Sequence, residues 1–297
     1  VFAALAADVA RGSASIAEMS AWREKYRGLP HLTLDTVKIF ADGVIEYPTQ
    51  SAALLEPYLD ADGKPGANRG EVYVAPRAFA GFVSAAAAQD FNVHVHAIGD
   101  RAVRETLDAF AAARATAAGR GVRFSISHLQ LIEPSDWPRF AALDVFASFQ
   151  LLWAQPNPYS IEAVAPYIGA ARMRYMYPAR GVHDAGGVVV GGSDWNVSSF
   201  NPFEAIDIGH TRRNPEEPQR PPLVPEQALP VEVLLRAYTI DAARMFGIED
   251  ETGSLRVGKA ADLVLVDRDP LAAGTVVRDT QVLGTMIDGV WVYRKKK

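Results

Sequence analysis

The sequence predicts an α/β protein: a (β/α) barrel of the TIM type with fewer strands than a complete barrel and a small β portion at its C-terminal end. Short apolar runs alternate with helix-like stretches, a pattern that produces a parallel sheet. Side chains able to bind a metal stand where these runs end, and the C-terminal ends of barrel strands converge on one pocket. After Gly247 the chain changes to short strands separated by Gly and Asp. We therefore expect the barrel over residues 1–247 and the small β portion, which the resemblance described below implies to belong to a β-sandwich, over residues 248–297.

The first 30 residues are Ala-rich and helix-like, with room for one strand. The first clear strand lies in TVKIFADG and ends near Lys38. The Gly- and Pro-rich stretch DADGKPGANRG then reads as an inserted loop, because Lys38 and His96 are about 58 residues apart, too far for one plain βα unit. VAPRAFAGFVSAAAAQD reads as a helix that precedes the strand ending at His96.

The strand that ends at His96 is followed by an expected helix, DRAVRETLDAFAAARATAAG. The next strand ends at His128, about 32 residues later, which is roughly the length of one βα unit. PSDWPRFAALD opens with Pro and Ser, which favour helix starts. It leads into DVFASFQLLWA, a strand candidate from Asp144 to Ala154 that contains no strong metal ligand.

The strand in GGVVVGGSDWN ends near Asp194, about 66 residues after His128 and thus roughly two βα units further on. PVEVLLRAYTIDAARMFGI has apolar residues at helical spacing and is expected to form one closing amphipathic helix. Strand ends number about five, whereas a complete barrel has eight. Either the barrel is incomplete or the sheet is not a closed barrel.

The composition is typical of a soluble globular enzyme, with 49% hydrophobic and 22% charged residues among 297. This length fits one large barrel domain. The net charge of −5 argues against a nucleic-acid partner, because phosphate binding needs a basic face. No apolar run approaches the roughly 20 residues that span a bilayer, so we expect no membrane partner. The chain has no cysteine, so any metal must use nitrogen and oxygen ligands.

Four residues at strand ends are candidates for a shared metal ion: Lys38, His96, His128 and Asp194. Each has an ordinary structural explanation when taken alone. Lys38 could be a solvated strand end, His128 a hydrogen-bonded core residue, and Asp194 a turn or helix-cap residue. Because these independent explanations would have to coincide with barrel spacing, we interpret the four residues as ligands of one site.

Six segments occur in a fixed order along the chain: VKIFADG, ALLEPY, VHAIGDRAV, SHLQLI, GGSDWNVSSFNPFEA and LLRAYTIDAARMFGIEDETGSLRVGKAADLVLVDRDP. Together they resemble the amidohydrolase superfamily, in the branch that includes N-substituted formamide deformylase. The resemblance runs from about Thr36 to Asp288 and corresponds to the C-terminal two-thirds of the family's chain. It implies a (β/α) barrel with a β-sandwich, one or two divalent ions with zinc favoured, and attack of a metal-bound hydroxide on an amide-type carbonyl.

By this resemblance, Lys38 corresponds to the family's fourth-strand lysine, which carbon dioxide carboxylates into a bridging ligand in two-metal members. His96 and His128 correspond to the fifth- and sixth-strand histidine ligands. Asp194 corresponds to the eighth-strand aspartate that binds metal and takes the proton from the attacking water. The chain departs from the family at the first-strand His-x-His pair, which should lie upstream of Lys38, where only His31 occurs.

The HVH motif places His94 and His96 on the same side of a strand, as two ligands of one ion require. In the family's fifth-strand context one histidine ligates, and we interpret His96 as that ligand. His94 is then expected to support a ligand or to line the pocket. Trp153 and Trp195 follow strands and either bind an apolar group of the substrate or pack the rim.

These residues predict a metal-dependent amidohydrolase that cleaves a C–N bond of an amide or formamide-type small molecule through a metal-activated water. Asp194 is the expected catalytic base, and then the acid toward the leaving amine. The alternative is a non-catalytic or truncated amidohydrolase-derived fragment that lacks the first-strand His-x-His and pairs its open strand edges with another copy. The expected partners are therefore a small-molecule amide and a second copy in a homo-oligomer, and the default compartment is the cytoplasm.

Overall fold

The structure is a computed structural model that describes residues 1–296, apart from the side chain of residue 117. Its first six strands form one parallel sheet in chain order: β1 (Phe2–Ala6), β2 (Thr33–Phe40), β3 (Asn92–Ala97), β4 (Phe124–His128), β5 (Val145–Phe149) and β6 (Val188–Gly191). The predicted α/β fold with a parallel sheet is confirmed, and β1 is the strand for which the first 30 residues left room. The strand order begins at β1 and ends at β6, so closure into a barrel stays a prediction.

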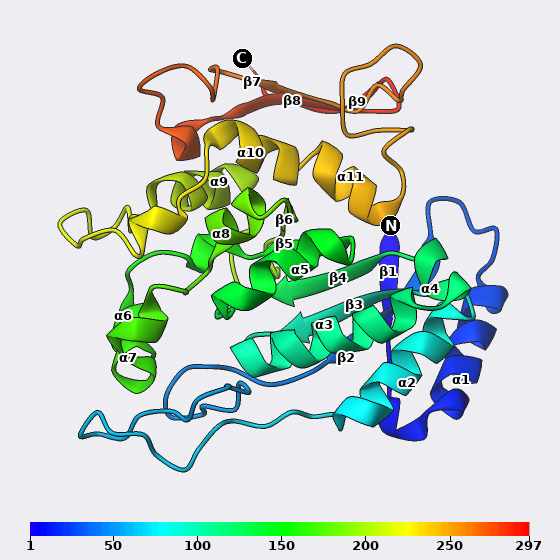
Figure 1. The fold of residues 1–297 in the computed structure, drawn as a ribbon. Coiled ribbons are helices and arrows are strands. Elements are labelled where there is room, and N and C mark those ends of the chain that lie inside the picture. Colours follow the sequence, from blue (N-terminus) through cyan, green and yellow to red (C-terminus); the bar gives the residue numbers. More distant parts are fainter. Residues whose placement is uncertain (297) are drawn as a thin grey trace. The chain divides into compact units, whose positions relative to one another are not determined.

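The chain packs as two compact units, of which the first comprises Val1–Ser148 and Asn157–Val188. In this unit three helices lie side by side along one face of strands β1 to β4 (Figure 1): α1 (Ser13–Lys25), α2 (Pro76–Ala87) and α3 (Asp100–Arg114). Proline begins α2, at a position where the missing N–H would have no helical partner. Asp100 in the first turn of α3 and Arg114 in its last turn both complement the helix dipole.

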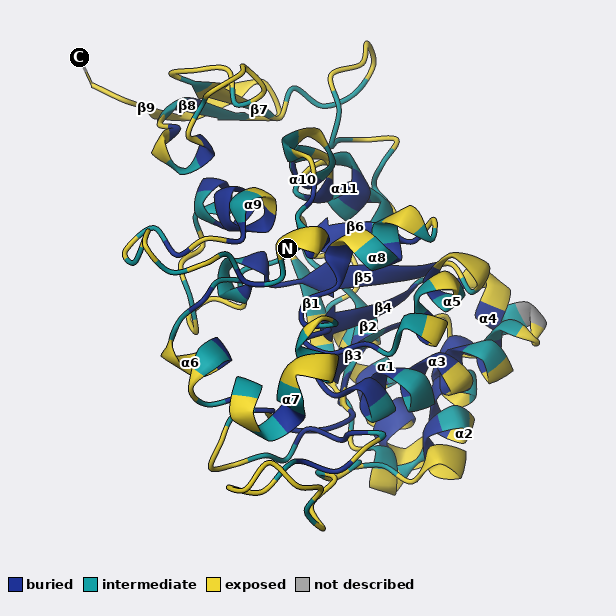
Figure 2. Cartoon of the chain, turned by 60° about the vertical axis from the view of Figure 1, so that its left-hand side comes forward, coloured by how far each residue is buried: buried dark blue, intermediate teal, exposed yellow. Residues whose placement is uncertain are grey.

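Strands β2, β3 and β4 alternate between an apolar and a polar face with a period of two. The apolar face consists of Val37, Ile39, Val93, Val95, Phe124 and Ile126, which are almost completely buried. Figure 2 draws β4 and β5 in the colour of buried residues. The ring of Phe124 stacks on that of Phe110 in α3, with centroids 4.4 Å apart, so this face packs against the helices. The opposite face carries polar side chains, and the candidate site is built on it.

Shorter elements complete the first unit: η1 (Val9–Arg11), α4 (Ala117–Gly121), η2 (Pro134–Asp136), α5 (Trp137–Ala142), α6 (Pro158–Ile161), α7 (Ala165–Met173) and α8 (Ala179–Asp184). The sequence predicted one helix over residues 100–119, whereas the structure has α3 and then a separate α4. The reason is local, because the hydroxyl of Thr116 accepts a hydrogen bond from the N–H of Gly119 and caps a new helix.

The second compact unit comprises Phe149–Pro156 and Val189–Lys297. Its elements are η3 (Leu151–Trp153), α9 (Pro202–Thr211), η4 (Pro225–Gln227), α10 (Val231–Ala237), α11 (Ile240–Phe246), β7 (Leu263–Val266), η5 (Val277–Asp279), β8 (Val282–Ile287) and β9 (Val290–Arg294). Strands β7, β8 and β9 form an antiparallel sheet, which confirms the predicted β character of the C-terminal segment. The predicted domain boundary at residue 247 stays a prediction. Within residues 1–296 we find no helix of the length and apolar character that crossing a membrane requires.

Two expected elements differ from the sequence prediction. The strand candidate from Asp144 to Ala154 is shorter, because the backbone at Gln150 (φ −96°, ψ 74°) turns from β5 into η3. The prediction of a single closing helix is wrong as well, since α10 and α11 are separated at Thr239, which has φ −128° and ψ −99°. The hydroxyl of Thr239 donates to the carbonyl of Leu235, and threonine bonds of this kind compete with the helical ladder.

Candidate metal and catalytic site

The polar face of the sheet brings the sequence-predicted residues of β2 and β3 into adjacent rows. Lys38 pairs with His94 across the β2–β3 ladder, and His94 pairs with Ser125 across the β3–β4 ladder. The next row on the same face joins Phe40, His96 and Ser127. Because side chains two residues apart on a strand share a face, His94 and His96 both belong to this surface, as the sequence predicted.

Lys38 and His94 are both held by serine hydroxyls of β4. The ammonium group of Lys38 donates to Ser127 Oγ at 2.9 Å, so its side chain extends from β2 across β3 to β4. His94 Nδ1 lies 2.7 Å from Ser125 Oγ. Burial, together with smaller electrostatic effects of Lys38 and His96, lowers the pKa of His94 to about 3. His94 is therefore a neutral imidazole at physiological pH, which suits a supporting role beside a cation.

His96 and His128 form a close pair of predicted ligands. Their rings meet edge to face with centroids 4.5 Å apart, and the two residues are only 8% and 7% exposed. In a regular strand His128 would share the helix-facing side with Ile126. Instead His128 has φ +78° and Leu129 has φ +53°, a left-handed turn that redirects the imidazole toward His96. Such conformations are uncommon for residues with a side chain and cluster at functional sites.

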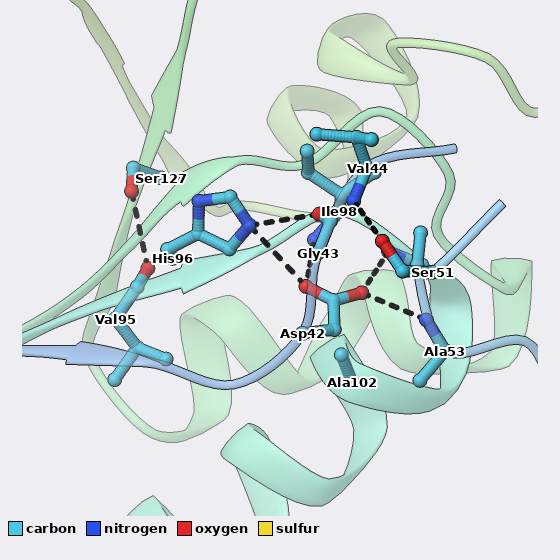
Figure 3. Close-up of polar contacts among 12 residues, drawn as sticks. Asp42, Gly43, Val44, Ser51, Ala53, Val95, His96, Ile98, Ala102 and Ser127 are labelled. Atoms are coloured by element: carbon cyan, nitrogen blue, oxygen red, sulfur yellow. Dashed lines mark hydrogen bonds and ion pairs between the residues drawn. The ribbon is translucent and has the colours of Figure 1, made fainter. Parts of the chain in front are cut away.

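Asp42 belongs to this site, although sequence reasoning does not identify it. Its carboxylate lies 3.5 Å from His96 Nε2 and accepts three backbone hydrogen bonds, shown in Figure 3. Burial raises the pKa of Asp42 to about 7, against the lowering effect of these N–H donors. The sequence signal is an Asp-Gly pair directly after a strand, which reads as a turn and hides the role of the carboxylate.

The second contact of His96 determines which ring nitrogen carries the proton. His96 Nε2 lies 3.0 Å from the carbonyl oxygen of Gly43. A carbonyl oxygen only accepts hydrogen bonds, so Nε2 must be the donor. In the neutral imidazole the lone pair then lies on Nδ1, and Nδ1 is the atom of His96 that could ligate a metal.

The donor set on the polar face fits a divalent ion in part. His96 and His128 supply two adjacent imidazoles, which suit zinc and similar ions. Lys38 is an ammonium donor toward Ser127 and has no lone pair until it loses its charge, as it would on carboxylation. Among residues 1–296, no group of three or more His, Cys, Asp or Glu side chains is arranged to hold a metal. The participation of a carboxylated Lys38 in a site here stays a prediction.

Asp194, Trp153 and Trp195 all lie in the second compact unit, and their place in the site stays a prediction. Asp194 follows β6, is exposed and has φ +53°. The indole of Trp195 is 70% exposed and meets the ring of Phe200 edge to face, with centroids 6.3 Å apart. Trp153 ends η3 and is half-buried.

A second buried carboxylate, Asp100, stands at the start of α3. Its Oδ1 accepts hydrogen bonds from the N–H groups of Leu55 and Arg101 at 2.8 and 2.9 Å. Together with Arg172 it lines a cavity of about 430 Å³. Burial raises the pKa of Asp100 to about 6, whereas its hydrogen bonds and the charge of Arg172 lower it. Ionisation of Asp100 in the folded chain therefore lowers the free energy of unfolding.

Replacing Asp100 by asparagine should change the free energy of unfolding more favourably at about pH 8 than at about pH 4. The difference between the two effects should be on the order of 2 kcal/mol. The folded pKa lies above the unfolded value of 3.8, so the stabilising contribution of protonated Asp100 is complete below that value and is lost as pH rises through about 6. Asparagine keeps the Oδ1 acceptor and never ionises. Urea unfolding of both proteins at the two pH values measures the difference, and an equal effect at both would contradict the assignment.

The chain is similar to several known proteins. A model of the amidohydrolase family matches residues 3–293. The chain is 29% identical over 265 residues to Protein LONG AFTER FAR-RED 3 of Arabidopsis thaliana, covering 88% of this chain and 43% of that protein. It is 30% identical over 208 residues to N-substituted formamide deformylase of Arthrobacter pascens, covering 69% of this chain and 37% of that protein.

A similar solved structure is that of an uncharacterized metal-dependent hydrolase from Pyrococcus furiosus. The TM-score is 0.72 at 25% sequence identity, over 92% of this chain and 51% of that one. The chain thus spans less than half the length of the two curated relatives and about half of this structure.

Proposed function

Because this chain belongs to the amidohydrolase family, we propose that it is a metal-dependent hydrolase that cleaves the C–N bond of an amide or formamide-type small molecule. The observation that carries the proposal is the edge-to-face pair of His96 and His128 at adjacent strand ends, on the face that Lys38 crosses. The membership confirms the resemblance stated from the sequence motifs. The name of the relative from Arthrobacter pascens, N-substituted formamide deformylase, supports a formamide as the first substrate class to test.

The residues proposed to hold the metal are His96 through Nδ1, His128, Asp194 and a carboxylated Lys38. A bound divalent ion, with zinc favoured, would lower the pKa of a water molecule toward neutrality and polarise the scissile carbonyl. The remaining chemistry belongs to the side chains. Asp194 is proposed to accept the proton of the attacking water and to deliver it to the nitrogen of the leaving amine.

His94 supports this chemistry by remaining neutral. A cationic imidazole beside Lys38 would repel a bound cation, and the low pKa of His94 prevents that charge from forming. Its hydrogen bond with Ser125 fixes the ring in the row next to His96. Trp153 and Trp195 are proposed to contact an apolar substituent on the substrate nitrogen.

A second candidate is a non-catalytic fragment of an amidohydrolase. It is favoured by one observation: the ammonium group of Lys38 donates to Ser127 Oγ and in this form offers no lone pair to a metal. Under this alternative the polar face of the sheet is inherited from an ancestral enzyme, and the chain hydrolyses no substrate.

Elemental analysis of the chain purified without chelator separates the two candidates. We expect one or two zinc ions per chain, released amine from an N-benzylformamide substrate, and a loss of about 100-fold or more in hydrolysis for Asp194→Ala. Asp184→Ala is the matched control, because this exposed carboxylate pairs with Arg180 outside the proposed site. A folded wild-type chain that binds no metal would support the fragment and overturn the hydrolase.

A further inference from the structure

The peptide group between Gly43 and Val44 links a loop hydroxyl to His96 (Figure 3). Its N–H donates to Ser51 Oγ at 3.1 Å, and its carbonyl accepts from His96 Nε2 at 3.0 Å. Because both contacts belong to one planar group, the Ser51 hydroxyl fixes the direction of the carbonyl oxygen. A Cβ on Gly43 would lie 2.1 Å from Ser51 Oγ, so only glycine permits this approach.

The carboxylate of Asp42 joins the chain segments around this peptide. Oδ1 accepts from the N–H of Ile98 at 3.0 Å, and Oδ2 accepts from those of Gly99 and Ala53 at 2.9 and 3.0 Å. These donors come from the end of β3 and from the loop that follows β2. Asp42 is 1% exposed, so water does not compete for its oxygens. Oδ1 also lies 3.5 Å from His96 Nε2, which brings a second acceptor to that nitrogen.

We propose that Asp42 is the positioning residue of His96, and that Ser51 assists it by orienting the Gly43 carbonyl. Two acceptors face Nε2, so they hold the imidazole as the Nε2–H tautomer and leave its lone pair on Nδ1. The relevance to metal binding rests on the proposed function. The tautomer is a property of the chain itself and can be tested without metal or substrate.

The isosteric change Asp42→Asn should alter the tautomer of the His96 imidazole. The asparagine oxygen best replaces Oδ2, which has two backbone donors, and the amide NH2 then replaces Oδ1. At that position the NH2 group opposes the Nε2–H of His96. This repulsion reduces the preference for a proton on Nε2, which the Gly43 carbonyl alone then supports, so the share of the Nδ1–H tautomer should rise in the variant.

Nitrogen-15 NMR of the histidine rings measures this tautomer directly in the metal-free chain at about pH 8, where histidine is neutral at its ordinary pKa. We expect the Nε2–H form of His96 to dominate in the wild type. In Asp42→Asn the ratio of Nε2–H to Nδ1–H should fall by about fivefold or more, the factor that corresponds to the net free energy of one hydrogen bond. An unchanged ratio would overturn the proposal.

Asp100→Asn is the matched control, because Asp100 anchors Leu55 of the same loop without contacting His96. It should leave the His96 tautomer unchanged, and an equal shift in this variant would mean that general loosening of the loop is the cause. Ser51→Ala provides a milder test if Asp42→Asn fails to fold. It removes the acceptor of the Val44 N–H and should shift the tautomer in the same direction by a smaller factor, and no shift would count against the proposal.

Zinc titration separates this inference from the proposed function. If the wild-type chain binds zinc, Asp42→Asn should weaken that binding by about 10- to 100-fold, as loss of a group that orients a histidine ligand typically does. Unchanged affinity would overturn the positioning role. If the wild type takes up no zinc, the proposed function fails, and the tautomer measurement still decides whether Asp42 controls His96.

Discussion

The His96→Asn variant is expected to lose bound zinc and hydrolysis, whereas His94→Asn should lose much less of both. The two residues stand on one face of β3, but only His96 meets His128, with ring centroids 4.5 Å apart. His94 is instead bonded to Ser125 and faces Lys38 in the ladder. Loss of a residue that orients a metal ligand typically lowers metal affinity or activity roughly 10- to 100-fold. Loss of the ligand itself should have a larger effect, so we expect zinc affinity and hydrolysis to fall by at least about 100-fold in His96→Asn.

The two variants should be compared by metal content after dialysis and by release of amine from a formamide. His94→Asn serves as the control for loss of an imidazole on the same strand, and circular dichroism verifies that both proteins fold. Loss of zinc in His94→Asn with retention in His96→Asn would show that the ligand of the HVH motif has been assigned to the wrong histidine.

Gly99→Ala should destabilise the chain by about 2–3 kcal/mol, because the new methyl group has no room. A Cβ at Gly99 would lie 2.1 Å from the carbonyl oxygen of Ala53, and the next nearest atoms also belong to the backbone of that residue. The loop or the start of α3 must therefore move. Since the N–H of Gly99 donates to Asp42, the same movement disturbs the carboxylate behind His96.

Gly81→Ala is the matched control for this change. It lies inside α2, and a Cβ there would meet no atom within 4 Å. Alanine is favoured over glycine in a helix by about 1 kcal/mol, so this variant should be more stable than the wild type. Urea unfolding with a common m value measures both effects, and a Gly99→Ala protein as stable as the wild type would show that the loop gives way at little cost.

The sequence predicts the parts of this fold that depend on local patterns. Short apolar runs locate β2, β3 and β4, and the residues near their ends include Lys38, His96 and His128. Helix-period patterns and start signals likewise locate α2 and α3. These features could be predicted because each depends on residues a few positions apart.

The sequence does not predict the features that depend on contacts between distant segments. Asp42 is recognisable only once Ala53, Ile98 and Gly99 surround it, and no local signal reports three donors from two other segments. The left-handed backbone conformation at His128 cannot be predicted from the sequence either, because a histidine after an apolar run ordinarily continues the strand. The break at Thr239 also escapes helical periodicity, which continues through it.

The Gly43–Val44 peptide has a consequence for the electronic character of His96. The hydrogen bond from its N–H to Ser51 polarises the amide and increases the negative charge on the carbonyl oxygen. That oxygen then draws more strongly on the Nε2 proton and shifts electron density into the ring. Nδ1 becomes a stronger Lewis base as a result, so under the proposed function a serine hydroxyl in a loop would raise the affinity of a strand histidine for a cation that the serine does not contact.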